Sequence, residues 1–273
     1  MAFIPDLSRR NLVPERMDDP NLPASDHALA LRGLRRINRF SGTVDQLARV
    51  VLGIIKTQRT KNLAGKKWTI LDIGCANGEN LIALQRKLSK EIDIQAIGWD
   101  ISPYAVEQAT LHCRENRLDP TQVRFEVVDI LGGKQGTPSG EQVRDDAHRA
   151  EPVADIVMNS LFLHHFEVPD ILRILKKSVA LSRVAVIADD LERTRVGWLL
   201  AKIGCHVLSR SPVVHFDGPQ SVRAAFTAEE MRQLAEEAGL KSISIVRHWP
   251  ARYSLIWQRN GSSQEFRTVD PLS

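Results

Sequence analysis

The 273-residue sequence predicts an α/β protein with a seven-stranded, mostly parallel sheet, helices on both faces and an antiparallel hairpin near the C-terminus. Three observations support this prediction. Five short segments rich in valine and isoleucine recur between residues 68 and 189, helical stretches separate most of them, and the last two strands are joined by only a few residues. Near-continuous apolar strands that alternate with helices are typical of a parallel sheet covered on both faces.

The central strands are expected at residues 68–74, 92–100, 123–131, 154–160 and 183–189. Helices are expected between them at about 79–90, 102–116 and 168–179. Ser102 followed by Pro103 supports the second of these helices, because serine caps a helix start and proline is favoured at the first helical position. Residues 132–152 are polar and rich in glycine, which predicts a mostly exposed loop.

The C-terminal segment predicts one more helix and a hairpin. Thr227 and Glu230 have the spacing of a capping box, and Gly239 is suited to end the helix. Two strands follow at 241–249 and 252–258. Their connection is far shorter than the dozen residues that a parallel crossover requires, so the pair must be antiparallel.

The N-terminal segment differs in character from the rest. Residues 1–24 are rich in proline and charge, which predicts an arm rather than a packed element. From residue 26 to about residue 39 apolar side chains recur every third residue, which predicts a one-sided helix, and a second helix is expected at 44–56.

Composition excludes several classes of protein. The three cysteines are odd in number and far apart, which argues against a disulfide framework or a cysteine metal site, and no other set of metal ligands is expected. No apolar run has the length of a signal peptide core or a membrane span, so a cytoplasmic protein is expected. The net charge of +4 is mild. Four arginines between residues 32 and 39 are interpreted as a solvated helix face, and a nucleic-acid partner is not expected.

The loop after the first strand, DIGCANG at 72–78, suggests a ligand site. Ligands of open parallel sheets bind beyond the carboxyl ends of the strands, and small residues let the backbone approach them closely. Asp100 ends the second strand and could accept hydrogen bonds from ribose hydroxyls. A dinucleotide site would use the same features, but its third glycine is replaced by Glu79, so a dehydrogenase is the weaker alternative.

The segment from Asp72 to Gly78 resembles motif I of the class I S-adenosylmethionine-dependent methyltransferases, with Ala76 in place of the middle glycine. GWDISPYAVEQA (98–109), FEVVDIL (125–131) and ADIVMNSLFLHHF (154–166) resemble the family's next three motifs, in order. The resemblance extends from residue 67 to about residue 258. It implies a Rossmann-like fold, a transferase activity and S-adenosylmethionine as the cofactor.

The resemblance also implies roles for residues and segments. Asp100 would bind the ribose, Asp129 the adenine amino group, and the glycine loop would face the amino-acid part of the cofactor. The expected cofactor-binding residues are Asp72, Gly74, Cys75, Gly78, Asp100, Ile101, Asp129, Ile130 and Asn159. The expected domains are an arm and helices covering the cofactor cleft (1–66), a methyltransferase domain (67–259) containing an acceptor-pocket or lid insertion (190–226), and a polar tail (260–273).

The fourth motif bears on the methyl acceptor. Asn159-Ser160-Leu161-Phe162 lacks the prolines of enzymes that methylate nucleobase amines. His164 and His165 follow, and one of them could act as a general base for a hydroxyl acceptor. Adjacent side chains point in different directions, and His165 is favoured slightly; alternatively, both histidines only pack or cap.

The segment 189–227 is the expected acceptor region. It is apolar from Val196 to Leu208, which predicts a lid over a lipophilic acceptor, a surface that touches a membrane, or a helix packed on the sheet. The polar residues expected to line the pocket are Asp190, Arg193, His215 and Arg223.

The pattern as a whole resembles bacterial methyltransferases found with polyketide-type pathways. This resemblance implies O-methylation of a phenolic or polyketide-like, lipophilic small molecule. Transfer to carbon or nitrogen, RNA methylation through the arginine-rich helix, and a non-catalytic cofactor-binding scaffold are the alternatives. The oligomeric state is left open.

Overall fold

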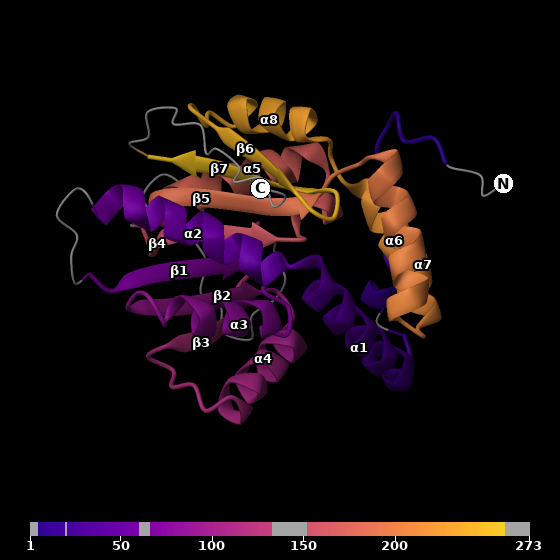
Figure 1. Cartoon of the computed structure of the whole chain (residues 1–273), viewed down its shortest axis with the longest axis horizontal. Helices are drawn as coiled ribbons and strands as arrows, with labels where there is room; N and C mark the ends of the chain where they lie inside the picture. Colours follow the sequence, from indigo (N-terminus) through magenta and orange to yellow (C-terminus); the bar gives the residue numbers. More distant parts are fainter. Residues whose placement is uncertain (1–4, 20, 60–65, 133–151, 260–273) are drawn as a thin grey trace, which may run out of the picture.

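The computed structural model describes residues 5–19, 21–59, 66–132 and 152–259. Seven strands form one sheet in the order β3-β2-β1-β4-β5-β7-β6 (Figure 1). The strands are β1 (Trp68–Ile73), β2 (Ile94–Asp100), β3 (Val123–Val127), β4 (Ala154–Ser160), β5 (Ser182–Leu191), β6 (Ser244–His248) and β7 (Arg252–Gln258). Strands β1 to β5 pair in parallel, whereas β7 runs antiparallel to β5 and β6. The predicted fold class, including the closing hairpin, is confirmed.

Eight α-helices and two short 3-10 helices lie within the described residues. The α-helices are α1 (Ala24–Ser41), α2 (Thr43–Arg59), α3 (Glu79–Leu88), α4 (Pro103–Glu115), α5 (Val168–Leu181), α6 (Arg195–Leu208), α7 (Pro212–Ala224) and α8 (Ala228–Glu237), and the 3-10 helices are η1 (Arg16–Asp18) and η2 (Leu163–His165). The predicted caps of α4 and α8 are present, including the reciprocal bonds of the capping box. None of the helices in the described ranges is long and apolar enough to cross a bilayer.

Apolar side chains cover both faces of the sheet and form two main cores. One core joins the sheet to α2 and α3, and the other joins it to α5 and α8. The strands alternate their side chains between the two faces. Strands β5 and β7 contribute to both cores, whereas the second faces of β1, β2 and β4 form a smaller third cluster. This arrangement leaves the carboxyl ends of the parallel strands as the edge at which loops can bind a ligand.

The third strand is shorter than expected. It ends at Val127, whereas the sequence predicted strand to residue 131. The Asp129 carboxylate accepts the Leu131 N–H at 2.8 Å, and the Asp129 carbonyl accepts the Gly132 N–H at 3.2 Å. These local bonds turn the chain away from the sheet, because aspartate competes with strand pairing for backbone donors. Most of the predicted loop at 132–152, and the tail at 260–273, lie outside the described residues.

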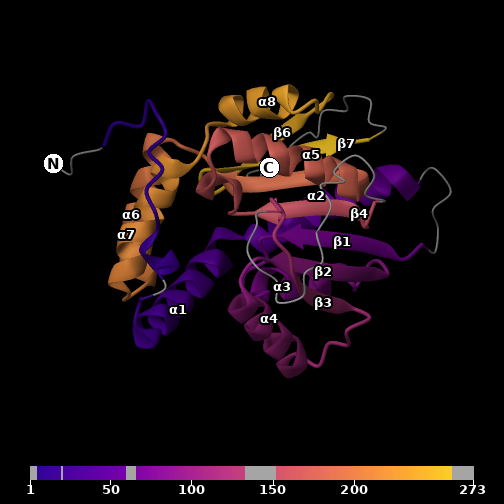
Figure 2. The same ribbon diagram turned by 180° about the vertical axis from the view of Figure 1, so that it is seen from behind.

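A helical layer of α1, α6 and α7 stands at one end of the sheet (Figures 1 and 2). Ala30 of α1, Cys205 of α6 and Val213 and Val214 of α7 form its small core. The segment 190–226 therefore contains two helices separated at residues 209–211, and α6 packs against α7 and α1. Of the three interpretations of this segment, a helix packed on the sheet is the one that this arrangement contradicts. Some of its apolar residues form the core of the helical layer, and others are exposed on α6.

The N-terminal arm is packed, in contrast to the prediction. The Asn11 N–H donates to the Arg223 carbonyl at 2.9 Å, and Asp217 of α7 accepts the backbone N–H groups of Arg16 and Met17. The Arg10 guanidinium donates to three carbonyls, among them that of His164. Figure 2 shows the arm running along α6 and α7. Most of these contacts are hydrogen bonds that involve backbone groups, so no periodic pattern of apolar residues in the arm indicates that it is packed.

Candidate functional site

The loop after β1 depends on glycine. Gly74 and Gly78 both have a φ of 74°, and Ala76 between them has a φ of 48°. Residues other than glycine rarely adopt a positive φ, because their Cβ then clashes with the backbone. A Cβ at Gly74 would lie 2.2 Å from a ring carbon of Phe162. The glycine is therefore required twice, for the turn and for the close approach of this aromatic ring.

Asp100 supports the same loop from the end of β2. Its Oδ2 accepts the Ala76 N–H at 2.8 Å, and its Oδ1 accepts the Ser102 N–H at 2.9 Å at the start of α4. Each carboxylate oxygen has two acceptor sites, so both oxygens can accept a further donor such as a ribose hydroxyl. Asp100 thus also positions the loop, a role that sequence reasoning missed.

Two buried polar side chains below the loops are unpaired. Asp72 Oδ1 and both amide atoms of Asn159 are buried without a hydrogen-bond partner among the described residues. Burial, together with the nearby charge of Asp100, raises the pKa of Asp72 to about 8. Leaving such groups unpaired costs about 1–3 kcal/mol each. They fit a polar ligand, and the ammonium and carboxylate of a bound amino-acid group offer the donors and acceptors they lack.

The remaining expected cofactor residues lie along the same edge. Cys75 is buried, and burial raises the pKa of its thiol, so it is not a reactive nucleophile. Ile101 is exposed after β2, and Ile130 is partly buried after β3 near Asp129. The structure brings all nine expected residues to the carboxyl ends of β1 to β4.

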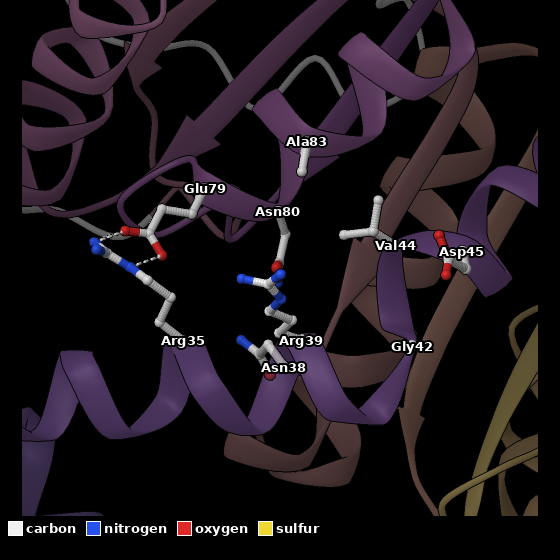
Figure 3. A pocket seen from close by; sticks show the side chains of 9 residues that line it. All are labelled: Arg35, Asn38, Arg39, Gly42, Val44, Asp45, Glu79, Asn80 and Ala83. Carbon is white, nitrogen blue, oxygen red and sulfur yellow. Dashed lines mark hydrogen bonds and ion pairs between the residues drawn. The ribbon is translucent and has the colours of Figure 1, made fainter. Parts of the chain in front are cut away.

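A pocket of about 300 Å³ lies beside the glycine loop, between α1, the start of α2 and the first turn of α3 (Figure 3). Arg35 of α1 pairs with both carboxylate oxygens of Glu79, the residue that follows Gly78. Arg39 and Asn80 also line the pocket. The Arg35–Glu79 pair holds α1 against the first turn of α3, next to the loop.

His164 forms the second part of the site. It lies in η2, after β4, and is buried. Its Nδ1 lies 2.7 Å from Asp190 Oδ1 at the end of β5, and its backbone N–H donates to Asp190 Oδ2 at 3.2 Å. Its Nε2 lies 3.7 Å from Oε1 of Glu15, which the N-terminal arm contributes. The Ser221 hydroxyl donates to the same Glu15 oxygen at 2.5 Å.

The two carboxylates control the charge of this histidine. Burial alone lowers the pKa of His164, but the charges and hydrogen bonds of Asp190 and Glu15 outweigh it and raise the pKa to about 10. Burial raises the pKa of Glu15, yet its contacts with the two histidines lower it overall. Burial likewise raises the pKa of Asp190, and the charge of His164 lowers it overall. Imidazolium between two carboxylates is thus the stable state near neutral pH.

His165 is placed differently from its neighbour. Its side chain is exposed, and its ring centroid lies 4.2 Å from that of His164. Of the pair, His164 is therefore the one whose ring is buried, with its Nδ1 on Asp190. Sequence reasoning named Asp190 but missed Glu15, because nothing in the proline-rich arm indicates which of its charges is buried.

The other polar residues expected in the acceptor region have different contacts. Arg193 is buried and donates to Glu230 and to the carbonyls of Leu7 and Ala225. His215 lies 2.8 Å from the Ser209 carbonyl, and Arg223 donates to a residue one turn before it in α7. The contacts of these three residues support the arm and the helical layer, whereas Asp190 contacts His164.

Comparison with known proteins is consistent with this geometry. Residues 32–245 match a family model described as a methyltransferase domain. No curated protein sequence matches the chain. Similar solved structures include an O-methyltransferase candidate from Nostoc punctiforme PCC 73102, at 15% identity over 92% of this chain and 64% of that chain with a TM-score of 0.55. The plantazolicin methyltransferase BpumL, in complex with a pentazolic desmethylPZN analogue and SAH, matches at 15% identity over 87% and 99% with a TM-score of 0.51.

A third similar structure is the magnesium protoporphyrin IX methyltransferase of Synechocystis PCC 6803 with bound SAH, at 18% identity over 80% of this chain and 81% of that chain, with a TM-score of 0.48. Identities this low show the fold alone, whereas the family model spans most of the chain and includes the glycine loop, Asp100 and the histidine pair. The chain therefore belongs to the methyltransferase-domain family, and it is an S-adenosylmethionine-dependent methyltransferase of the class I fold.

Proposed function

We propose that the protein transfers a methyl group from S-adenosylmethionine to a hydroxyl of a phenolic or polyketide-like, lipophilic small molecule. The observation that carries the proposal is the buried pair of His164, which follows the fourth motif, and Asp190 at the end of β5. A hydroxyl must lose its proton as the oxygen attacks the methyl carbon, and a phenol has a pKa of about 10. A base held beside the cofactor edge is therefore useful for oxygen and unnecessary for many carbon or nitrogen nucleophiles.

The geometry supports His164 rather than His165 as the base. Nδ1 of His164 lies 2.7 Å from Asp190. In the neutral ring, which dominates only above the pKa of about 10, the proton therefore stays on Nδ1 and Nε2 is the atom that accepts a proton. Asp190 stabilises the imidazolium as it forms. His165 differs in that its side chain is exposed. In the proposed step the O–CH3 bond forms, the S–CH3 bond breaks to leave S-adenosylhomocysteine, and the hydroxyl proton moves to Nε2.

The surroundings of His164 support an aromatic or lipophilic acceptor. Phe162 and Phe166 flank η2 with ring centroids 4.7 Å apart at 63°, and Phe162 also lies against Gly74 of the cofactor loop. Aromatic walls bind planar apolar ligands through their large contact area and edge-to-face geometry. The arm adds two polar groups beside the same histidine, because Glu15 lies 3.7 Å from its Nε2 and Arg10 donates to its carbonyl.

The proposal is tested with full-length protein, tritium-labelled S-adenosylmethionine and fractionated cell extract, followed by a panel of alkylated phenols. Label in an organic-extractable product that releases its methyl group on ether cleavage supports O-methylation. Label that enters RNA, or a product with a carbon- or nitrogen-bound methyl group, would overturn it in favour of another acceptor. Tight binding of S-adenosylhomocysteine without transfer to any fraction would indicate a cofactor-binding scaffold.

A further inference from the structure

Helix α6 exposes an apolar stripe that the fold does not use. Val196, Leu199, Ile203 and Val207 are 64%, 41%, 53% and 75% exposed. Their spacing of three and four residues places them on one face of the helix, about 16 Å long at 1.5 Å per residue. Single exposed apolar residues are ordinary, but a continuous row along one helix indicates a surface that binds something.

A basic row runs beside this stripe. Arg195, Lys202 and His206 each precede a stripe residue by one position, so they form a parallel row about 100° around the helix. Exposed Arg210 continues the positive charge just beyond the helix. The sequence contains no aspartate or glutamate between residues 194 and 216. The exposed side of α6 is therefore apolar along one line and positive along the next.

The opposite side of α6 accounts for its packing. Trp198 and Cys205 are buried there, and Cys205 belongs to the small core that joins α6 to α1 and α7. The apolar character of the stripe is thus additional to what packing requires. The turn between β6 and β7 lies beside the first turn of α6, since a Cβ at Gly197 would approach the Cβ of Ala251 to 3.0 Å. This turn carries Trp249, which is also largely exposed.

We propose that this face of α6 docks the protein on the surface of a bilayer that contains anionic lipids. An interfacial helix of this kind buries its apolar line at the level of the lipid headgroups and pairs its lysines and arginines with anionic phosphates. Exposed tryptophan is favoured at the same depth. The charge argues against a second copy of this chain as the occupant, because two such faces would bring their basic rows together.

The position of α6 gives this docking a purpose that rests on the proposed function. The helical layer of α1, α6 and α7 stands at the end of the sheet toward which the parallel strands point (Figures 1 and 2), and the cofactor loop follows β1 there, as His164 follows β4. A lipophilic acceptor dissolved in the bilayer would enter from this side. The docking itself is independent of which acceptor atom is methylated.

The test measures partition of the full-length protein onto vesicles of phosphatidylcholine with about 30 mol% phosphatidylglycerol, and onto pure phosphatidylcholine, by co-sedimentation. We expect binding to the anionic vesicles that weakens with added salt. The double variant Ile203→Glu/Val207→Glu should bind at least about tenfold more weakly, because two charges replace the apolar line. The matched control is Leu111→Glu, a similarly exposed leucine on α4, which should bind like the parent protein.

A second variant separates the two rows. Arg195→Gln/Lys202→Gln keeps the stripe and should lower binding to anionic vesicles by about twenty- to thirtyfold, at about fivefold for each charge. It should leave binding to pure phosphatidylcholine unchanged. Affinity for S-adenosylhomocysteine and the unfolding temperature of each variant report whether the fold is intact, and neither measurement depends on the acceptor.

Three outcomes would overturn the proposal. The parent protein could fail to bind anionic vesicles, or the α6 variants and Leu111→Glu could bind equally well. The parent protein could also form a dimer in sedimentation velocity that Ile203→Glu/Val207→Glu dissociates, with no vesicle binding, which would identify the face as a subunit interface. If binding fails while phenol methylation succeeds, the docking is refuted and the proposed function stands.

Discussion

Replacing Glu15 by glutamine is expected to lower the pKa of His164 and to shift the pH–rate profile toward lower pH. The carboxylate of Glu15 lies 3.7 Å from His164 Nε2 and stabilises the imidazolium form. Only neutral imidazole can accept a proton from a hydroxyl, so the stabilised cation is the inactive form at low pH. Removing the negative charge should therefore raise the fraction of active enzyme below the pKa, and activity at pH 8 should increase.

The magnitude follows from the distance. Two unit charges at 3.7 Å interact by about 4 kcal/mol at an effective dielectric constant of about 20, which equals about three pH units. Glutamine keeps a carbonyl that can accept from Nε2, so we expect a smaller shift of about one to two pH units from the parent value of about 10. A shift of one unit would increase the neutral fraction of His164 at pH 8 about tenfold.

Two measurements test this expectation. Nitrogen-15 NMR of the histidine rings gives the pKa of His164 directly, with the signal assigned from a His164→Asn sample. The pH dependence of kcat with a fixed phenol and saturating cofactor gives the kinetic midpoint, and the acceptor's own ionisation cancels between parent and variant. Glu236→Gln, an exposed glutamate on α8, is the matched control and should change neither value.

The results distinguish the possible roles. If the NMR midpoint moves and the kinetic midpoint does not, His164 is not the base. If Glu15→Gln abolishes activity at every pH, Glu15 itself accepts the proton of the acceptor hydroxyl. An unchanged NMR midpoint would show that the arm does not hold Glu15 against His164 in solution.

Three further results are expected. Asp100→Ala should weaken binding of S-adenosylhomocysteine by about a hundredfold or more, because it removes a ribose acceptor and releases the glycine loop; calorimetry giving the parent affinity would place the ribose elsewhere. Gly74→Ala should abolish cofactor binding, whereas Gly204→Ala, where an added Cβ meets nothing within 4 Å, should leave it intact; equal affinities would contradict the close approach inferred at the loop. His164→Ala should lower kcat by about a hundred- to ten-thousandfold and His165→Ala by only a few fold, with cofactor affinity unchanged in both, and the reverse order would make His165 the base.

Most of the fold could be predicted because local sequence patterns indicate the strands and helices. Buried parallel strands are runs of valine and isoleucine, and the start of α4 follows from the serine-proline pair that precedes its first turn. The limits of β3 were wrong because Asp129 turns the chain by bonds that no hydrophobic period records. The position of the expected cofactor-binding residues was predictable too, because these residues lie at or just after the carboxyl ends of the predicted strands.

The arm and the state of the histidine pair could not be predicted from local pattern. Glu15 and His164 are 149 residues apart in the sequence, and their contact depends on the bonds that hold the arm, among them those from the Arg16 and Met17 backbone to Asp217. Such a bond depends on two residues that are far apart in sequence and individually unremarkable in type. A single sequence therefore names the histidines and Asp190, but not Glu15, the second carboxylate that raises the pKa of His164.

Two adjacent aspartates at the end of β5 form separate hydrogen-bond and ion-pair networks on the two faces of the sheet. Successive side chains of a strand point to opposite faces, so Asp189 and Asp190 serve different networks. Asp190 faces His164 on the side of the N-terminal arm. Asp189 is buried on the other face, where it pairs with Arg252 and lies 2.7 Å from Nε2 of His248.

The second network reaches the helices that cover the cofactor loop. Arg252 also donates to Thr43 at the start of α2, at 2.9 Å, and to Ser160 at the end of β4, at 3.2 Å. Burial raises the pKa of Asp189, but Arg252 and His248 outweigh it and lower the pKa overall, so this carboxylate stays charged. The charge on Asp189 thereby anchors the corner between α1 and α2, while the charge on Asp190 anchors the histidine. Two neighbouring carboxylates of opposite orientation thus tie the corner between α1 and α2, and His164, to the same strand.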